Sequence, residues 1–133
     1  MILMVFEKVK APNNKKDFMK WYEEQVKWEE EHSYESIKVA SANLKNWFME
    51  MIQIFPPMNG EFATDDLPDN DENLEKYIAD YCIGKSVIYT SFAWSVAEEA
   101  YDTVLTLALK HNVGFFDVSG NEEIILSVNN KLE

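Results

Sequence analysis

An antiparallel hairpin near the middle of the chain restricts the possible folds most strongly. Residues 77–94 read YIADYCIGKSVIYTSFAW, two runs rich in β-branched and aromatic residues on either side of Gly84 and Lys85. This pattern favours two strands joined by a two-residue type II′ turn, with Ile83 opposite Ser86 and Tyr81 opposite Ile88. Alternation predicts a more apolar face of Tyr77, Ala79, Tyr81, Ile83, Ser86, Ile88, Thr90 and Phe92, and a mixed, open face of Ile78, Asp80, Cys82, Val87, Tyr89 and Ser91.

Three other segments show the spacing of amphipathic helices. The first begins near Lys15, the second follows Ser41, and the third follows the hairpin. Their expected ends are marked by capping and helix-breaking residues. These are Asn13 or Asn14 for the first helix, Ser41 with Pro56 and Pro57 for the second, and a Ser95–Glu98 capping box with Asn112 or Gly114 for the third.

The order of these elements predicts the fold. Strands are also expected in ILMVFEKV at the N-terminus and in VGFFDV and EIILSV near the C-terminus, which gives β-α-α-β-β-α-β-β. Removing one helix and one strand leaves βαββαβ, the split βαβ pattern of ferredoxin-like folds. Right-handed crossovers then place the helices on one face of an antiparallel sheet. We therefore expect a single α+β domain over residues 1–133, ferredoxin-like, with an extra helix and a C-terminal hairpin strand.

Composition argues against several classes of function. The chain is 47% hydrophobic, which argues against disorder, yet no apolar run reaches the roughly 18 residues that span a bilayer. Cys82 is the only cysteine, so an intramolecular disulfide is impossible and we expect a cytoplasmic protein. The net charge is −12, and all 12 basic residues are lysines. Because phosphate binding depends on cationic side chains, arginine above all, we expect neither a nucleic-acid partner nor an acidic membrane partner.

The segment DDLPDNDEN, residues 65–73, is the most acidic part of the chain. Asp69, Asp71 and Asn73 match the first three ligand positions of an EF-hand loop, and Asp80 falls at the twelfth. However, Leu74 stands where the EF-hand needs glycine, so we predict no metal site. Clustered like charges instead favour a recognition surface for a basic protein. The partner-binding residues expected in this segment are Asp65, Asp66, Asp69, Asp71 and Glu72.

No catalytic or cofactor-binding motif stands out. Cys82 with His32 or His111 lacks a diagnostic local signature, and a free cysteine is most often a small buried hydrophobe. The four glycines are scattered and form no phosphate-binding loop, and no Cys/His cluster suits zinc. We therefore expect no cofactor and no enzymatic activity. Trp94, at the junction of the hairpin and the third helix, is interpreted as a core residue.

The open face of the predicted sheet is a second candidate surface. If Phe116 points into the core, Phe115 and Asp117 face outward with Asp80 and Tyr89, and we expect these four outward residues to bind a partner. The apolar residues on this face predict a homodimer. Asp117 has an alternative role, in which its carboxylate accepts hydrogen bonds from the amides of the following turn and locks it.

Two stretches carry a resemblance. FAWSVAEEAYDTVLTLALKHNVGFFDVSG (92–120) and WFMEMIQIFPPMNG (47–60) are similar to a family of small, acidic, stand-alone bacterial proteins. The size and acidity also resemble those of immunity proteins, which neutralise bacterial toxins. The resemblance implies no catalytic residue. We therefore expect a non-enzymatic, protein-binding domain, such as an immunity-type inhibitor of a basic toxin. The alternative is a small-ligand sensor domain that uses a cleft between the sheet and the long loop after Met58.

Overall fold

Antiparallel strands form a single six-stranded sheet in the computed structural model, which describes residues 1–58, 60, 62–63 and 75–132. The strand order is β2-β3-β1-β4-β5-β6, and every neighbouring pair is antiparallel. The α+β prediction is therefore confirmed, although the last strand was not predicted. The strands are β1 (Ile2–Phe6), β2 (Asp80–Ile83), β3 (Val87–Ser91), β4 (Gly114–Phe116), β5 (Ile124–Ser127) and β6 (Asn130–Leu132).

Three α-helices and three short 3-10 turns complete the described part of the chain. The helices are α1 (Lys15–Gln25), α2 (Ala42–Ile54) and α4 (Ala97–Lys110), and the turns are η1 (Lys8–Lys10), η2 (Ile37–Val39) and η3 (Trp94–Val96). The connection through α2 joins β1 to β2, and β3 lies between these two strands. Helix α4 joins β3 to β4, and β1 lies between them.

The ends of the helices follow the sequence in most cases. Asn14 caps α1 by accepting a hydrogen bond from the Asp17 amide at 2.9 Å, and Ser41 caps α2. Helix α4 ends before Asn112, which adopts the left-handed conformation with a φ of 58°. The predicted Ser95–Glu98 capping box is wrong. Buried Val96 is the N-cap residue of α4, and its side chain makes no capping hydrogen bond.

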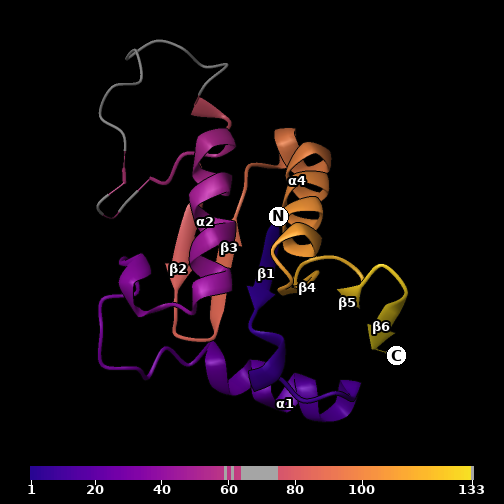
Figure 1. The fold of residues 1–133 in the computed structure, drawn as a ribbon. Coiled ribbons are helices and arrows are strands. Elements are labelled where there is room, and N and C mark those ends of the chain that lie inside the picture. The colour runs from indigo at the N-terminus through magenta and orange to yellow at the C-terminus, as the bar shows by residue number, and fades with distance from the viewer. Residues whose placement is uncertain (59, 61, 64–74, 133) are drawn as a thin grey trace.

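The helices lie on both faces of the sheet, so the prediction that all of them share one face is wrong. Helices α2 and α4 lie side by side over one face (Figure 1) and cover Leu3 and Val5 of β1. Helix α1 packs against the opposite face, where Phe18 contacts Met4 and Phe6. The cause is β1 itself, since side chains on both of its faces are apolar and both must leave water.

The β2–β3 hairpin has the predicted faces but a different register. Ile83 lies opposite Ile88, and the Gly84 amide donates a hydrogen bond to the Val87 carbonyl at 2.8 Å, so the turn residues are Lys85 and Ser86. The pairing moved by two residues, which keeps every side chain on its predicted face. Six of the eight residues of the predicted apolar face belong to the α2/α4 core or pack against it, namely Tyr77, Ala79, Tyr81, Ile83, Ile88 and Phe92. Thr90 is also buried, whereas Ser86 lies in the turn, and Asp80 on the other face is exposed.

The prediction that one phenylalanine of β4 points outward is also wrong. Phe115 was expected to point outward, but it is fully buried against α4 and the main core. Phe116 is buried on the other face, where its ring contacts Phe18 and Tyr22 of α1. Once α1 covers that face, both rings are buried and neither is available to a partner.

Within the described part of the chain, no helix combines the length and the apolar character needed to cross a membrane.

Close packing at Gly114 gives a test of the α1 side of the sheet. A Cβ atom on Gly114 would lie 2.2 Å from the Cζ atom of Phe6. The Phe6 ring cannot easily move, because its centroid lies 4.9 Å from that of Phe18 and 5.9 Å from that of Trp21. We expect Gly114→Ala to lower the free energy of unfolding by about 1–3 kcal/mol, measured by urea denaturation.

The matched control is the same substitution in a Phe6→Leu background. The smaller side chain leaves room for the added methyl group, so the second change should cost less there. An equal cost in both backgrounds would contradict this account of the packing.

Candidate functional site

The predicted partner-binding residues do not gather into one site. Asp80 is exposed on β2, and Tyr89 on β3 is half-buried, with the Trp28 ring packed edge-on at 5.6 Å. Phe115 and Asp117 are buried, so the prediction that they face outward is wrong. The remaining five, Asp65, Asp66, Asp69, Asp71 and Glu72, lie outside the described residues.

Asp117 locks a turn, as its alternative interpretation predicted. Its Oδ1 atom accepts a hydrogen bond from the Gly120 amide at 3.1 Å. A Cβ atom on Gly120 would lie 2.3 Å from Oδ2 of the same carboxylate, so a side chain there would displace it. The carboxylate is used inside the β4–β5 connection, and the expectation that Asp117 faces outward is wrong.

The apolar patch that motivated the homodimer prediction is not present. Val87 is 1% exposed beneath α1, and Phe115 points into the main core. Tyr89 alone of the three apolar residues remains partly accessible. A homodimer therefore stays a prediction without its original structural basis.

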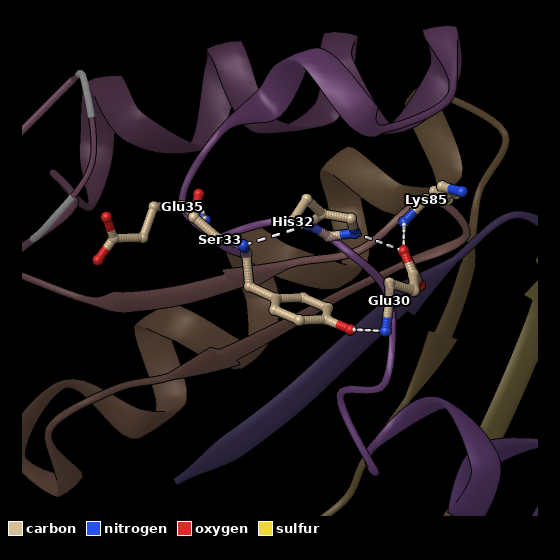
Figure 2. Close-up of polar contacts among 6 residues, drawn as sticks. Glu30, His32, Ser33, Glu35 and Lys85 are labelled. Carbon is tan, nitrogen blue, oxygen red and sulfur yellow. Dashed lines mark hydrogen bonds and ion pairs between the residues drawn. The ribbon is translucent and has the colours of Figure 1, made fainter.

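A cluster of polar contacts around His32 is the most connected group in the described residues (Figure 2). The His32 Nε2 atom lies 2.6 Å from Oε1 of Glu30, and the Lys85 amide donates to the same oxygen at 3.1 Å. The Tyr34 amide donates to Nδ1 of His32 at 3.2 Å, and the Tyr34 carbonyl accepts a hydrogen bond from the Ile83 amide at 2.8 Å. These bonds fasten residues 30–34 to the β2–β3 hairpin.

The same contacts argue against catalysis by His32. A general base needs one ring nitrogen free to accept a proton. Here Nδ1 accepts from the Tyr34 amide, and Nε2 faces Glu30. The nearby hollow of about 370 Å³ is lined by Ser33, Glu35, Ser36 and Gly60, and His32 does not line it. The cluster therefore connects residues 30–34 to the hairpin, and neither ring nitrogen of His32 is free to act as a base.

His111 is likewise paired with a carboxylate. Its Nε2 atom lies 3.1 Å from Oε1 of Glu50, and Lys110 donates to the same oxygen at 2.6 Å. The Lys110 ammonium, together with His111, lowers the pKa of Glu50 below its ordinary value. This three-residue group joins the C-terminal end of α4 to α2 and holds the two helices together.

Cys82 is not an activated nucleophile. Burial on β2, with a smaller contribution from the Asp80 carboxylate, raises the pKa of its thiol to about 11. A catalytic cysteine requires the opposite shift, produced by a cation or a helix N-terminus. Among residues with described positions, no three His, Cys, Asp or Glu side chains are close enough to hold a metal ion.

The net charge is distributed unevenly along the chain. Residues 1–45 hold eight lysines and eight acidic residues, whereas residues 46–133 hold four lysines and sixteen acidic residues. The whole net charge of −12 therefore belongs to the second part. Of its described elements, the first half of α4 is the most acidic, with Glu98, Glu99 and Asp102 all exposed within two turns of the helix.

An exposed tryptophan lies beside these carboxylates. Trp94 in η3 is 72% exposed, the highest exposure of any described aromatic side chain. We call Trp94, Glu98, Glu99 and Asp102 together the α4 surface. A hollow of about 440 Å³ is lined by Trp94, Glu98 and Glu99 with the η3 backbone, and a second of about 410 Å³ is lined by Glu98 and Asp102 with Tyr101.

The carboxylates of the α4 surface have no cationic partner. No lysine of the described chain forms an ion pair with Glu98, Glu99 or Asp102. The Tyr77 hydroxyl donates to Oε2 of Glu99 at 2.8 Å, and this hydrogen bond raises the pKa of Tyr77. The surface thus combines an aromatic ring with three negative charges that the chain itself does not neutralise.

The interpretation of Trp94 as a core residue is wrong, for a definable reason. Strand alternation from Phe92 would point Trp94 inward. However, β3 ends at Ser91, and the η3 turn brings Val96 into the core in its place, at 4% exposure. One feature of the sequence could have predicted the exposure of Trp94. Its immediate neighbours, Ala93 and Ser95, are small, and two glutamates follow shortly after, so no large apolar side chain next to it covers the ring.

Comparison of the chain with protein-family models, with curated proteins and with solved structures found no match. The resemblance of residues 47–60 and 92–120 to small acidic bacterial proteins therefore stays a prediction.

The raised pKa of the Cys82 thiol can be tested by its reactivity. We expect the folded protein to react with a thiol reagent at pH 8 about a hundredfold more slowly than the unfolded chain, because very little thiolate is present. Asp80→Asn should lower the thiol pKa, as measured from the pH dependence of the reaction rate. Asp102→Asn, on the other face of the molecule, is the matched control. Equal profiles for all three proteins would contradict the role of Asp80.

The lowered pKa of Glu50 predicts that the stability of the protein depends on pH. A pKa that is lowered in the folded state stabilises the protein above the ordinary pKa of 4.5, and this stabilisation disappears as the pH falls through the folded-state value. Wild type should therefore be more stable than Lys110→Met at pH 7, and the difference should shrink toward pH 3. Urea denaturation at several pH values measures it. Lys38→Met removes an exposed lysine that has no ion pair and should show no such trend.

Proposed function

We propose that this chain is a non-enzymatic, acidic protein-binding domain that recognises a basic protein through the α4 surface. The observation that carries the proposal is the exposed Trp94 ring beside the carboxylates of Glu98 and Glu99, neither of which forms an ion pair with a described lysine. A large exposed aromatic residue is the type of side chain that dominates binding energy at protein interfaces. Complementary charge accelerates association and disfavours wrong partners.

The specific form that we propose is inhibition of a basic bacterial toxin, in the manner of immunity proteins. The charge distribution supports it, because the lysines are concentrated before residue 46 and the negative surface lies beyond it. The acidic segment at residues 65–73, which lies outside the described residues, adds five carboxylates to the net negative charge of the chain. The histidine and cysteine environments support a non-enzymatic function, since neither His32 nor Cys82 is arranged for catalysis.

The ferredoxin-like topology belongs to the same proposal. Support comes from the four strands β2-β3-β1-β4, in which each helical connection joins two strands that are separated by a third. The alternative function, a small-ligand sensor, relied on a cleft between the sheet and the segment after Met58. Most of that segment lies outside the described residues, and no observation favours the alternative.

The test compares two variants with the same net charge. The surface variant carries Glu98→Gln, Glu99→Gln and Asp102→Asn, and the control variant carries Glu23→Gln, Glu29→Gln and Glu31→Gln, all exposed and near α1. Basic proteins captured from native cytosol at low salt are identified first, and their association rates are then measured in purified form. We expect the surface variant to bind roughly three- to tenfold more slowly at low ionic strength, with the control unchanged.

High salt should reduce the rate for wild type and remove most of the difference between the variants. A partner that binds wild type, surface variant and control variant equally fast would contradict the proposal. The free energy of unfolding should stay nearly the same in both variants, because all six side chains are exposed.

A further inference from the structure

We infer that the hollow beside Trp94 binds one arginine side chain of the partner, with the guanidinium stacked on the indole ring and paired with Glu98 or Glu99. The inference rests on the proposed function and specifies its chemistry. The hollow has a volume of about 440 Å³ and is lined by one aromatic side chain and two carboxylates, so its walls supply both kinds of contact that a guanidinium makes.

The ring and the carboxylates belong to adjacent elements that hold them in place. Trp94 is in η3, which is anchored by buried Val96, and Glu98 and Glu99 are in the first turn of α4. The Tyr77 hydroxyl holds Glu99 at 2.8 Å. Lys76 lies over the Tyr77 ring at 5.5 Å from its centroid, so this lysine is placed against a different aromatic ring and not against Trp94.

The electrostatics of this place favour a cation despite the helix terminus. The N-terminal end of a helix carries the equivalent of about half a positive charge, which repels cations. Two full negative charges, on Glu98 and Glu99, exceed that value several times. No described lysine neutralises them, and the chain contains no arginine that would occupy the ring from within.

Arginine fits this hollow better than lysine or an apolar side chain. A guanidinium is planar and weakly hydrated, so it stacks on an indole and binds a carboxylate through two hydrogen bonds at once. An ammonium keeps more of its water and forms no planar stack. An apolar side chain would cover the ring but would remove water from the carboxylates without pairing them.

The experiment uses the full chain and two probes that differ in one side chain, the capped peptides Gly-Arg-Gly and Gly-Lys-Gly. The titration is followed by NMR of the four tryptophan indole N–H resonances, and Trp94→Phe identifies the Trp94 signal. We expect a saturable shift of this signal alone, with the arginine peptide bound about two- to fivefold more tightly than the lysine peptide. Trp94→Leu should remove that preference, and the Glu23, Glu29 and Glu31 control variant should keep it.

The outcomes separate this inference from the proposed function. Equal affinity for the two peptides, or a preference that survives in Trp94→Leu, overturns the arginine site. If this occurs while the Glu98, Glu99 and Asp102 variant still binds the basic partner more slowly, the proposed function stands without it. An arginine preference at Trp94 with a partner that ignores the same three carboxylates would overturn the proposed function instead.

Discussion

The structure depends on the burial of β1 from both sides. Leu3 and Val5 face α2 and α4, Met4 and Phe6 face α1, and all four side chains are fully buried. A strand of this kind cannot lie on a one-layered sheet, because one row of apolar side chains would stay in water. The sheet therefore needs a helix on each face, and β1 takes its place among the inner strands, between β3 and β4.

The two sides of the sheet differ in how far their polar groups are paired within the chain. Phe18 of α1 packs into the apolar cluster between α1 and the sheet. The contact of His32 with Glu30 helps to fasten residues 30–34, which follow α1, to the hairpin. Both groups are already satisfied by partners within the chain. The first half of α4 is different, since Glu98 and Asp102 have no cationic partner and Trp94 is uncovered. Exposed aromatic rings and charged groups without a partner in the same chain are typical of protein-binding surfaces.

Local signals predicted much of the fold and little of the candidate site. Capping by Asn14 and Ser41, the faces of the hairpin and the Asp117 turn lock were all visible in the sequence, because each depends on residues close along the chain. The hairpin register was misplaced because a Gly84-Lys85 turn and a Lys85-Ser86 turn give the same alternation. The site was missed because Trp94 has the composition of a core residue, and its exposure depends on where β3 ends.

The sequence by itself determined the three helices, the first five strands and their order, the −12 charge and the absence of arginine. These properties depend on composition and on periodicity over a few residues. Only the tertiary structure decided which face α1 covers and whether Phe115 or Phe116 meets α4. Two adjacent apolar residues in a strand must point to opposite faces, and periodicity cannot choose between them when both faces are buried. That choice is made by long-range packing, which places one ring against α4 and the other against α1.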